Sequence, residues 1–200
     1  MKLTSLVILL SIFNFQVMAQ KPTDVKITAL TNKIALSLHS VWLKGYRLKN
    51  ADTPREKAIP LSIGETADSA LKKLGYYPKI RINEKGELVQ DINQDAKKIV
   101  PALNLKLNGG PARAYAEYIL NHDFKVRADF VEGSSAVHEI WILNNEWQRE
   151  SNPGLFVSYS ELPNNEKIKD LDVLKVALDQ MNPTITQSSA FKNYYKELSK

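Results

Sequence analysis

The sequence contains no cysteine. This absence excludes disulfide bonds, thiol catalysis, cysteine-based zinc sites and the lipid-modified cysteine of a standard bacterial lipoprotein. Exported eukaryotic proteins of this size usually carry disulfides, because their compartment permits them. If the chain is exported, the lack of cysteine therefore favours a bacterial periplasm.

Long apolar runs are also scarce, and the one that stands out lies at the start. Lys2 precedes the mostly apolar stretch Leu3–Val17, and Val17-Met18-Ala19 fits a small-residue cleavage site. This order is typical of a secretory signal peptide. A membrane anchor is the alternative, but a stable span needs about 20 apolar residues. We therefore predict a signal peptide over residues 1–19, a mature protein over residues 20–200 without a stable membrane span, and a periplasmic or secreted location.

The chain has little excess charge of either sign. Once Lys2 is removed with the signal peptide, 26 basic and 22 acidic residues leave a net charge of about +4. The densest basic stretch, Lys44 to Lys57, also contains Asp52 and Glu56. A nucleic-acid-binding protein is expected to concentrate its charge on one stripe. The charge pattern therefore predicts a solvated surface and no nucleic-acid partner.

Motifs for catalysis or metal binding are missing as well. The sequence has no phosphate-binding loop, no Gly-x-Ser-x-Gly and no His-Glu-x-x-His. We interpret Gly109-Gly110-Pro111 as a turn into a helix. The three histidines, His39, His122 and His138, lack ligand spacing. We therefore predict no metal site and no cofactor.

One group of residues resembles the components of a nucleophilic site. Ser134 and Ser135 lie near His138, with Glu132 and Glu139 close by. A nucleophile needs a base within hydrogen-bond reach and a group that orients the base. Because a solvent-exposed turn has the same composition, we interpret Glu132-Gly133-Ser134-Ser135 as the turn of a hairpin and predict no catalytic residues.

Apolar residues at helical spacing alternate with turn signals along the chain. Thr66 is a predicted N-cap, and Gly75 suits a left-handed helix end. Residues 46–63 look irregular. This spacing predicts helices over residues 24–44, 64–75, 94–100, 111–122, 168–181 and 190–198.

Two segments show the alternation of a β-hairpin. Residues 79–83 and 88–89 flank the turn Glu84–Glu87. Phe124, Val126, Ala128 and Phe130 alternate with polar residues and precede the return strand 137–143, so they are expected to point inward. A third strand is predicted over residues 155–159. The order predicts an α+β fold, with an antiparallel sheet of hairpins packed against several amphipathic helices, in one domain that could divide near residues 101–110.

Part of the chain resembles the SmpA/OmlA envelope family. The run Ile63–Gly75, followed by Pro78, is similar to the opening of that family, whose domains pair a Gly-x-Thr helix ending in Leu-Gly-x-Pro with a small antiparallel sheet. These domains are similar in architecture to β-lactamase inhibitor protein. Residues 124–133, followed by residues 137–140, look like the later hairpin of the family. The resemblance implies a binding module rather than an enzyme.

The loop from Asn144 to Gly154 is the predicted interaction surface. Exposed aromatic and arginine side chains supply most interface hot spots, and the candidate binding residues are Trp147, Arg149, Asn145 and Glu146. A partly buried loop tryptophan is the alternative for Trp147. We expect a protein that binds another envelope protein, as an assembly factor, an inhibitor or an immunity-type protein. An envelope hydrolase with catalytic residues dispersed in the sequence, or a small-ligand carrier, remains the alternative.

Overall fold

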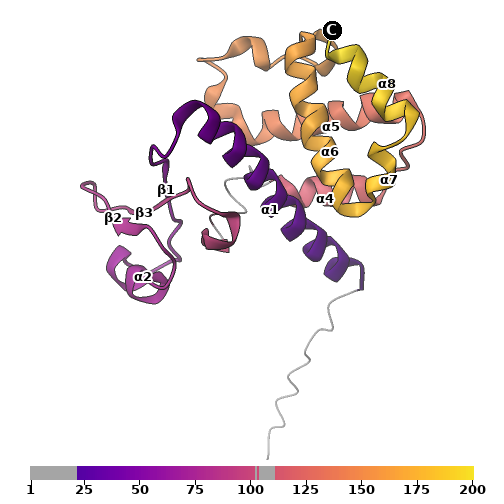
Figure 1. The fold of residues 1–200 in the computed structure, drawn as a ribbon. Coiled ribbons are helices and arrows are strands. Elements are labelled where there is room, and N and C mark those ends of the chain that lie inside the picture. Colours follow the sequence, from indigo (N-terminus) through magenta and orange to yellow (C-terminus); the bar gives the residue numbers. More distant parts are fainter. Residues whose placement is uncertain (1–21, 102, 104–110) are drawn as a thin grey trace, which may run out of the picture.

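A computed structural model describes residues 22–101, 103 and 111–200 of the chain (Figure 1). Most of these residues form helices, and one small antiparallel sheet lies to the side of them, so the predicted α+β class is confirmed. The signal peptide predicted over residues 1–19 and the predicted turn residues Gly109 and Gly110 lie outside the described residues, as does most of the segment 101–110.

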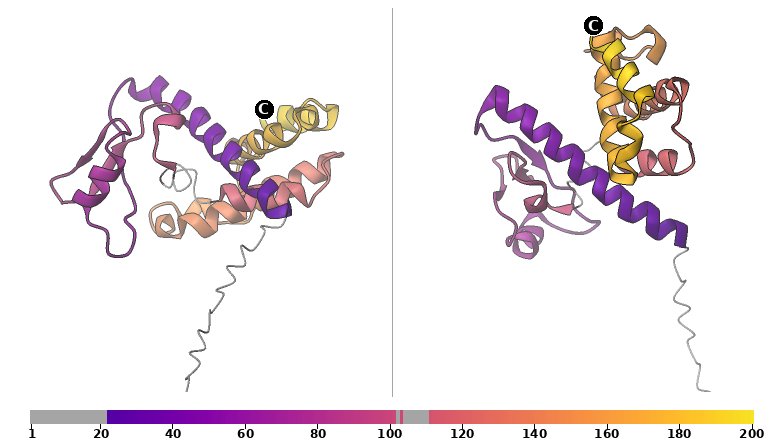
Figure 2. Two further views of the ribbon diagram at one scale, coloured as in Figure 1. Left: turned by 90° about the horizontal axis from the view of Figure 1, so that it is seen from below. Right: turned by 45° about the vertical axis from the view of Figure 1, so that its right-hand side comes forward.

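The first helix, α1 (Pro22–Asn50), separates two groups of elements. Figures 1 and 2 show the small sheet with α2 on one side of α1 and the remaining helices on the other. Ile27, Leu30 and Ile34 point into the larger group of helices at the predicted helical spacing. The helix runs past Gly45, where prediction ended it, because Arg47 in its last turns donates a hydrogen bond of 2.9 Å from Nε to Asn93 Oδ1.

The sheet has three short strands in the order β1-β3-β2. The predicted first hairpin is confirmed as β2 (Ile80–Ile82) and β3 (Leu88–Asp91), which pair antiparallel with Ile82 opposite Leu88. Strand β1 (Glu56–Ala58) adds to the free edge of β3. It lies within residues 46–63, which were predicted to be irregular. All three of its residues are exposed, so the strand has no alternation of buried and exposed residues by which it could have been recognised.

A second set of buried residues fills the space between the sheet and α2 (Ala67–Leu74). The predicted cap is confirmed, because the Thr66 side chain accepts a hydrogen bond from the Ser69 backbone N–H and the Ser69 hydroxyl accepts one from Thr66. Gly75 has a φ of −60°, so the predicted left-handed helix end is wrong. This smaller core contains Ile59, Ala70, Leu88, Ile92, Ile99, Val100 and Leu103; the last three flank or follow the short 3-10 helix η1 (Ala96–Lys98).

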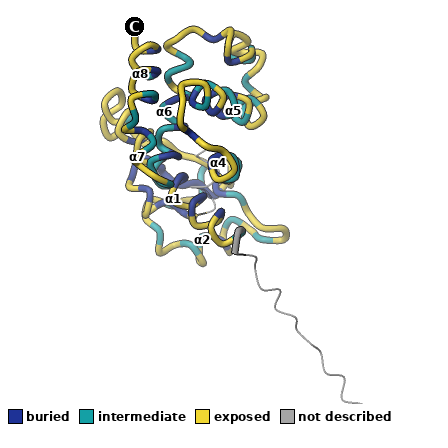
Figure 3. Tube along the Cα trace, turned by 90° about the vertical axis from the view of Figure 1, so that its right-hand side faces the viewer, coloured by how far each residue is buried: buried dark blue, intermediate teal, exposed yellow. Residues whose placement is uncertain are grey.

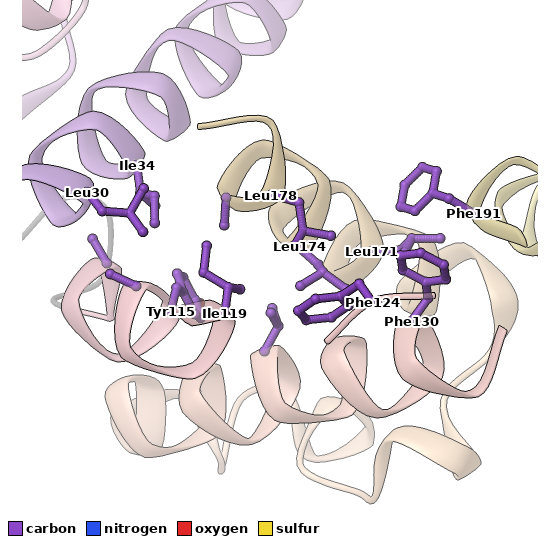
Figure 4. Close-up of a cluster of buried hydrophobic side chains, with 14 of the residues drawn as sticks. Leu30, Ile34, Tyr115, Ile119, Phe124, Phe130, Leu171, Leu174, Leu178 and Phe191 are labelled. Atoms are coloured by element: carbon purple, nitrogen blue, oxygen red, sulfur yellow. The ribbon is translucent and has the colours of Figure 1, made fainter. Parts of the chain in front are cut away.

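The main core lies among α1 and the helices of the C-terminal half (Figure 4). Those helices are α4 (Ala112–Leu120), α5 (Arg127–Asn145), α6 (Asn164–Met181), α7 (Pro183–Thr186) and α8 (Ser189–Leu198). The predictions of α4, α6 and α8 are confirmed to within a few residues. Figure 3 shows the buried faces of α4, α5, α6 and α8 turned toward one another. Within the described part of the chain, no helix combines the length and hydropathy needed to cross a membrane.

Helix α5 occupies the segment in which the second hairpin was predicted, and that prediction is wrong. Its buried residues are Phe130, Gly133, Ser134, Val137 and His138, whose spacing is that of one helix face. Asp129 starts the helix, because its Oδ2 accepts hydrogen bonds from the backbone N–H groups of Lys125 and Val126. Phe124 and Phe130 are buried as expected, but Val126 is 57% exposed and Ala128 is also exposed.

The glycine taken for a turn residue marks the closest approach of α5 to its neighbours. A Cβ atom on Gly133 would lie 2.8 Å from Leu174 Cδ2 on α6 and 2.9 Å from Phe124 Cε1. Carbon atoms in ordinary contact are about 3.5–4.0 Å apart. Gly133 is therefore a packing residue within a helix. The part of the SmpA/OmlA resemblance that rested on a hairpin here has no counterpart in the structure.

The strand predicted over residues 155–159 is also absent. With no neighbouring hairpin to pair with, this segment forms the short 3-10 helices η3 (Pro153–Leu155) and η4 (Tyr159–Glu161). A capping box between Ser158 and Glu161 begins η4. A further 3-10 turn, η2 (Glu146–Gln148), continues directly from α5. Together these turns return the chain from the end of α5 to α6.

Candidate functional site

The end of α5 carries two large apolar side chains that the fold leaves in solvent. Leu143 is 80% exposed and Trp147 is 79% exposed. They are four residues apart in the sequence, on either side of Asn145, where α5 passes into η2. The structure therefore places the predicted candidate Trp147 on the surface, and it leaves Leu143, which is near it in the sequence, exposed as well.

Arg149 and Glu146, two other predicted site residues, are bonded to each other. The Arg149 guanidinium donates two hydrogen bonds to the Glu146 carboxylate, one of them of 2.9 Å from Nη2 to Oε2. It also lies over the ring of Phe156, 4.6 Å from the ring centroid. Phe156 in turn packs against Trp141, with the ring centroids 5.3 Å apart. Arg149 thus connects the loop to itself and, through Phe156, to α5.

Asn145, the fourth predicted site residue, joins the end of α5 to η2. Its side-chain N–H donates to the Trp141 carbonyl at 2.8 Å, and its Oδ1 accepts from Gln148 Nε2 at 3.0 Å. It also lines a cavity of about 430 Å³ between α1, β1 and α5, together with Trp42 and Trp141. Asn145 therefore positions the loop.

A buried histidine and a buried carboxyl group connect this loop to the helices beneath it. His138 on α5 is 3% exposed, and its Nδ1 lies 3.2 Å from Asp170 Oδ2 on α6. Its other ring nitrogen, Nε2, lies 2.9 Å from the backbone oxygen of Val157. The ring of Trp141 stacks nearly parallel to the imidazole, at 6.1 Å between centroids. His138 therefore contacts α6 on one edge and the returning loop on the other.

The partners of His138 determine where its hydrogens lie. A carbonyl oxygen only accepts hydrogen bonds, so Nε2 must carry a hydrogen to bond to Val157. Nδ1 and the Asp170 carboxyl group then share one further proton, either as an imidazolium beside a carboxylate or as a neutral imidazole beside a carboxylic acid. Burial, helped by the nearby Glu166 carboxylate and opposed by Lys169, raises the pKa of Asp170 to about 7. The Asp170 carboxyl group can therefore keep a proton at mildly acidic pH.

A cavity of about 670 Å³ opens next to His138, between the start of α5, the start of α6 and α8. On one wall the Tyr159 and Tyr194 hydroxyls are hydrogen-bonded at 2.8 Å. On another, Arg127 is bonded to Glu197, at 2.6 Å from Nη2 to Oε1, and lies over the ring of Tyr194. Three of the charged side chains that line this cavity are already bonded within the protein: Arg127 and Glu197 to each other, and Lys167 to the Ser160 carbonyl. These three therefore contribute to the shape of the cavity more than to its charge.

The serines near His138 are not arranged for nucleophilic catalysis. Ser134 is fully buried, and its hydroxyl, which faces Tyr159, makes no hydrogen bond of normal geometry. Ser135 lines the cavity. Both ring nitrogens of His138 are occupied by Asp170 and Val157, so neither serine has a base to accept its proton.

The other two histidines have hydrogen-bond partners of their own. His39 on α1 bonds through Nε2 to the Gln94 carbonyl at 3.0 Å, and burial lowers its pKa. His122 follows α4 and bonds to the Tyr118 carbonyl. Across the described residues, no three His, Asp or Glu side chains gather in a way that could hold a metal ion.

Sequence reasoning missed Asp170, Val157 and Leu143. One signal could have found Asp170: it stands four and seven residues before the buried Leu174 and Ala177, so it shares their helix face. A carboxyl group on a buried face requires a partner. Val157 contributes only its backbone oxygen, which no side-chain pattern reveals.

The chain was compared with protein-family models, with curated proteins and with solved structures, and no match was found in any of the three comparisons.

Proposed function

We propose that this protein is exported to the periplasm and acts by binding another envelope protein through the end of α5 and the loop that follows it. The observation that carries the proposal is the exposure of two large apolar side chains, Leu143 at the end of α5 and Trp147 at the start of the loop that follows. The signal-peptide pattern of residues 1–19 supports the export. The protein would act on this partner as an assembly factor, an inhibitor or an immunity-type protein that neutralises a toxin.

The surroundings of these two side chains favour recognition by a fixed surface. Arg149 bonds to Glu146 and covers Phe156, while Asn145 bonds to Trp141. A loop that is already held in one conformation loses less entropy on binding than a free one. Tryptophan at the centre of such a surface supplies a large apolar area with few rotatable bonds. The geometry thus suits a protein partner that offers an apolar pocket.

The test begins with a photo-crosslinking side chain placed at Leu143, and at Val126 as the matched control. Val126 is another exposed apolar residue, 57% exposed, next to the opposite end of the same helix. A protein of the cell envelope that is captured from position 143 and not from position 126 is then purified. Its dissociation constant is measured with the wild-type protein and with the variants Trp147→Ala and Val126→Ala.

We expect Trp147→Ala to weaken binding at least about 30-fold, which corresponds to the 2 kcal/mol of an interface hot spot. Val126→Ala should leave the dissociation constant unchanged. Circular dichroism establishes that both variants are folded. If Trp147→Ala binds the purified partner as tightly as the wild type, the end of α5 is not the interface and the proposal is wrong.

A further inference from the structure

The His138–Asp170 pair lies under the loop that carries Trp147, and its hydrogen bonds depend on one shared proton. We propose that this pair is a pH-sensitive latch, which fixes residues 146–157 while the shared proton is present and releases them when it leaves. The latch would regulate the proposed binding surface by pH. The latch rests on the proposed function only in that this loop is taken to be the interface.

Two contacts connect α5 to the loop, and a third holds the loop together. His138 Nε2 donates to the Val157 carbonyl at 2.9 Å. The preceding residue, Phe156, packs against Trp141, one turn along α5 from His138. Arg149 covers the other part of Phe156 and bonds to Glu146. Of these three contacts, the hydrogen bond to Val157 is the one whose existence depends on a titratable group.

Loss of the shared proton removes one of the two hydrogen bonds of His138. If the remaining hydrogen stays on Nε2, the Nδ1 lone pair faces the Asp170 carboxylate at 3.2 Å and repels it. If the hydrogen moves to Nδ1, the bond to Asp170 is kept, but the Nε2 lone pair faces the Val157 oxygen. The second arrangement satisfies the buried carboxylate, and a buried unpaired charge is the more costly of the two. The bond to the loop is therefore the one that is lost.

The charged and titratable groups around the pair do not replace it as the sensor. Those that face it from the packed elements are Glu166, Lys167 and Lys169 on α6, Glu139 on α5, Tyr115 on α4, Tyr159 on η4 and Tyr194 on α8. Burial raises the pKa of each of the three tyrosines, so they stay neutral near pH 7. Glu166 and Lys169 form an ion pair, at 2.6 Å from Lys169 Nζ to Glu166 Oε1, and Lys167 Nζ donates to the Ser160 carbonyl. Glu139 is exposed to solvent.

The sign of the effect follows from the two states of the loop. While the loop covers the pair, burial raises the pKa of Asp170 to about 7. When the loop opens and the carboxyl group becomes hydrated, its pKa returns toward the lower ordinary value. The latched state therefore binds the proton more tightly than the open state, so its advantage is present at mildly acidic pH and is lost as pH rises through about 7.

Amide hydrogen exchange of the isolated protein, followed by NMR between pH 6 and pH 8, tests the latch. The reporters are the amides of Leu155 and Phe156, which donate to the Asn152 and Pro153 carbonyls at 3.0 Å. After correction for the intrinsic exchange rates, we expect their protection to fall severalfold in the wild type as the pH rises from 6 to 8. Amides of α8 should show no such fall. Over the same range, the ring ¹⁵N shifts should show the hydrogen of His138 moving from Nε2 to Nδ1.

Two variants fix the pair in its protonated form. In Asp170→Asn a neutral amide N–H can donate to Nδ1, and in His138→Gln the amide can donate to Val157 without titrating. Both should show constant protection of Leu155 and Phe156 from pH 6 to pH 8. Asp172→Asn, on the same helix, bonds to Tyr195 in the wild type and not to His138, so this variant should keep the wild-type fall.

The latch is overturned if protection in the wild type does not change with pH, if it falls equally in Asp170→Asn and His138→Gln, or if Nε2 of His138 keeps its hydrogen at pH 8. Because these measurements use the protein alone, they are independent of any partner. A partner that binds Trp147→Ala as tightly as the wild type would refute the proposed interface and leave the latch intact. If Trp147→Ala weakens partner binding but the protection of Leu155 and Phe156 does not change with pH, the latch is refuted and the proposed interface stands.

Discussion

Gly133 provides a direct test of how α5 packs. In Gly133→Ala the new methyl group would lie 2.8 Å from Leu174 Cδ2 and 2.9 Å from Phe124 Cε1. Carbon atoms in contact are normally at least about 3.5 Å apart, so these neighbours must move by roughly 0.5 Å or more. Neither neighbour can move into solvent, because Leu174 is 0% and Phe124 is 7% exposed. Overpacking of this kind costs about 1–3 kcal/mol.

The same substitution also brings a gain, which sets the expected net value. Alanine is favoured over glycine within a helix by about 1 kcal/mol. The free energy of unfolding should therefore fall by about 1 kcal/mol in Gly133→Ala. It should fall further in Gly133→Val, which adds two more carbon atoms at the same place and has a lower helix propensity. Gly154→Ala is the matched control, since a Cβ atom at Gly154 would meet nothing within 4 Å.

Urea denaturation followed by circular dichroism measures these differences. We expect Gly154→Ala to lie within about 0.5 kcal/mol of the wild type, as surface substitutions usually do. If Gly133→Ala were instead more stable by about 1 kcal/mol, helix propensity alone would be acting. The close approach of α5 to α6 would then be wrong.

Two further predictions concern the core and the start of the mature chain. Phe130→Ala should lower the free energy of unfolding by about 3–5 kcal/mol, because Phe130 is 0% exposed and packs against Phe191. Val126→Ala should change it by less than about 0.5 kcal/mol. If urea denaturation gave equal effects for the two variants, both side chains would be buried, as in the predicted strand, and the helix would be wrong. N-terminal sequencing of the protein from an envelope fraction should begin at Gln20, and recovery of intact Met1 in the membrane pellet would indicate an uncleaved anchor.

The elements that could be predicted from the sequence are those specified by local signals. The capping residue Thr66, the turn between β2 and β3, and the apolar spacing of α4, α6 and α8 act over a few residues each, and the structure contains all of them. Strand β1 could not be predicted, because three exposed residues form a strand only when β3 offers them its edge.

Helix α5 shows why alternation alone is an ambiguous signal. Phe124 and Phe130 are apolar and buried, and apolar and polar residues alternate between them, so the pattern is also the one expected of a strand. The helical face was hidden because two of its members, Gly133 and Ser134, are small residues that usually mark turns. The lack of a side chain at Gly133 is required by its contact with Leu174 on α6, which lies more than 30 residues further along the sequence. Tertiary packing therefore decided the secondary structure here.

For the candidate site, the amino-acid composition indicated which loop could bind a partner, but not how the side chains around that loop contact one another. The loop with Trp147 follows from an aromatic residue and an arginine among polar neighbours, and its role in binding stays a prediction. The contact between His138 and Asp170 joins residues on two different helices. No short-range pattern encodes such a contact, and the backbone oxygen of Val157 has no side-chain signature at all.

The position of α1 has a consequence for the order in which the molecule can form. This helix packs against α4 and α6, and its buried residues belong to the same core as Phe191 and Tyr194 of α8. Contacts between segments so far apart in the sequence form late, because a long loop must close before they are gained. The smaller core, from Ile59 to Leu103, needs no residue beyond position 103. If the chain becomes free to fold from its N-terminus onward, the sheet can therefore assemble first, while the apolar face of α1 stays uncovered until the C-terminal helices are present.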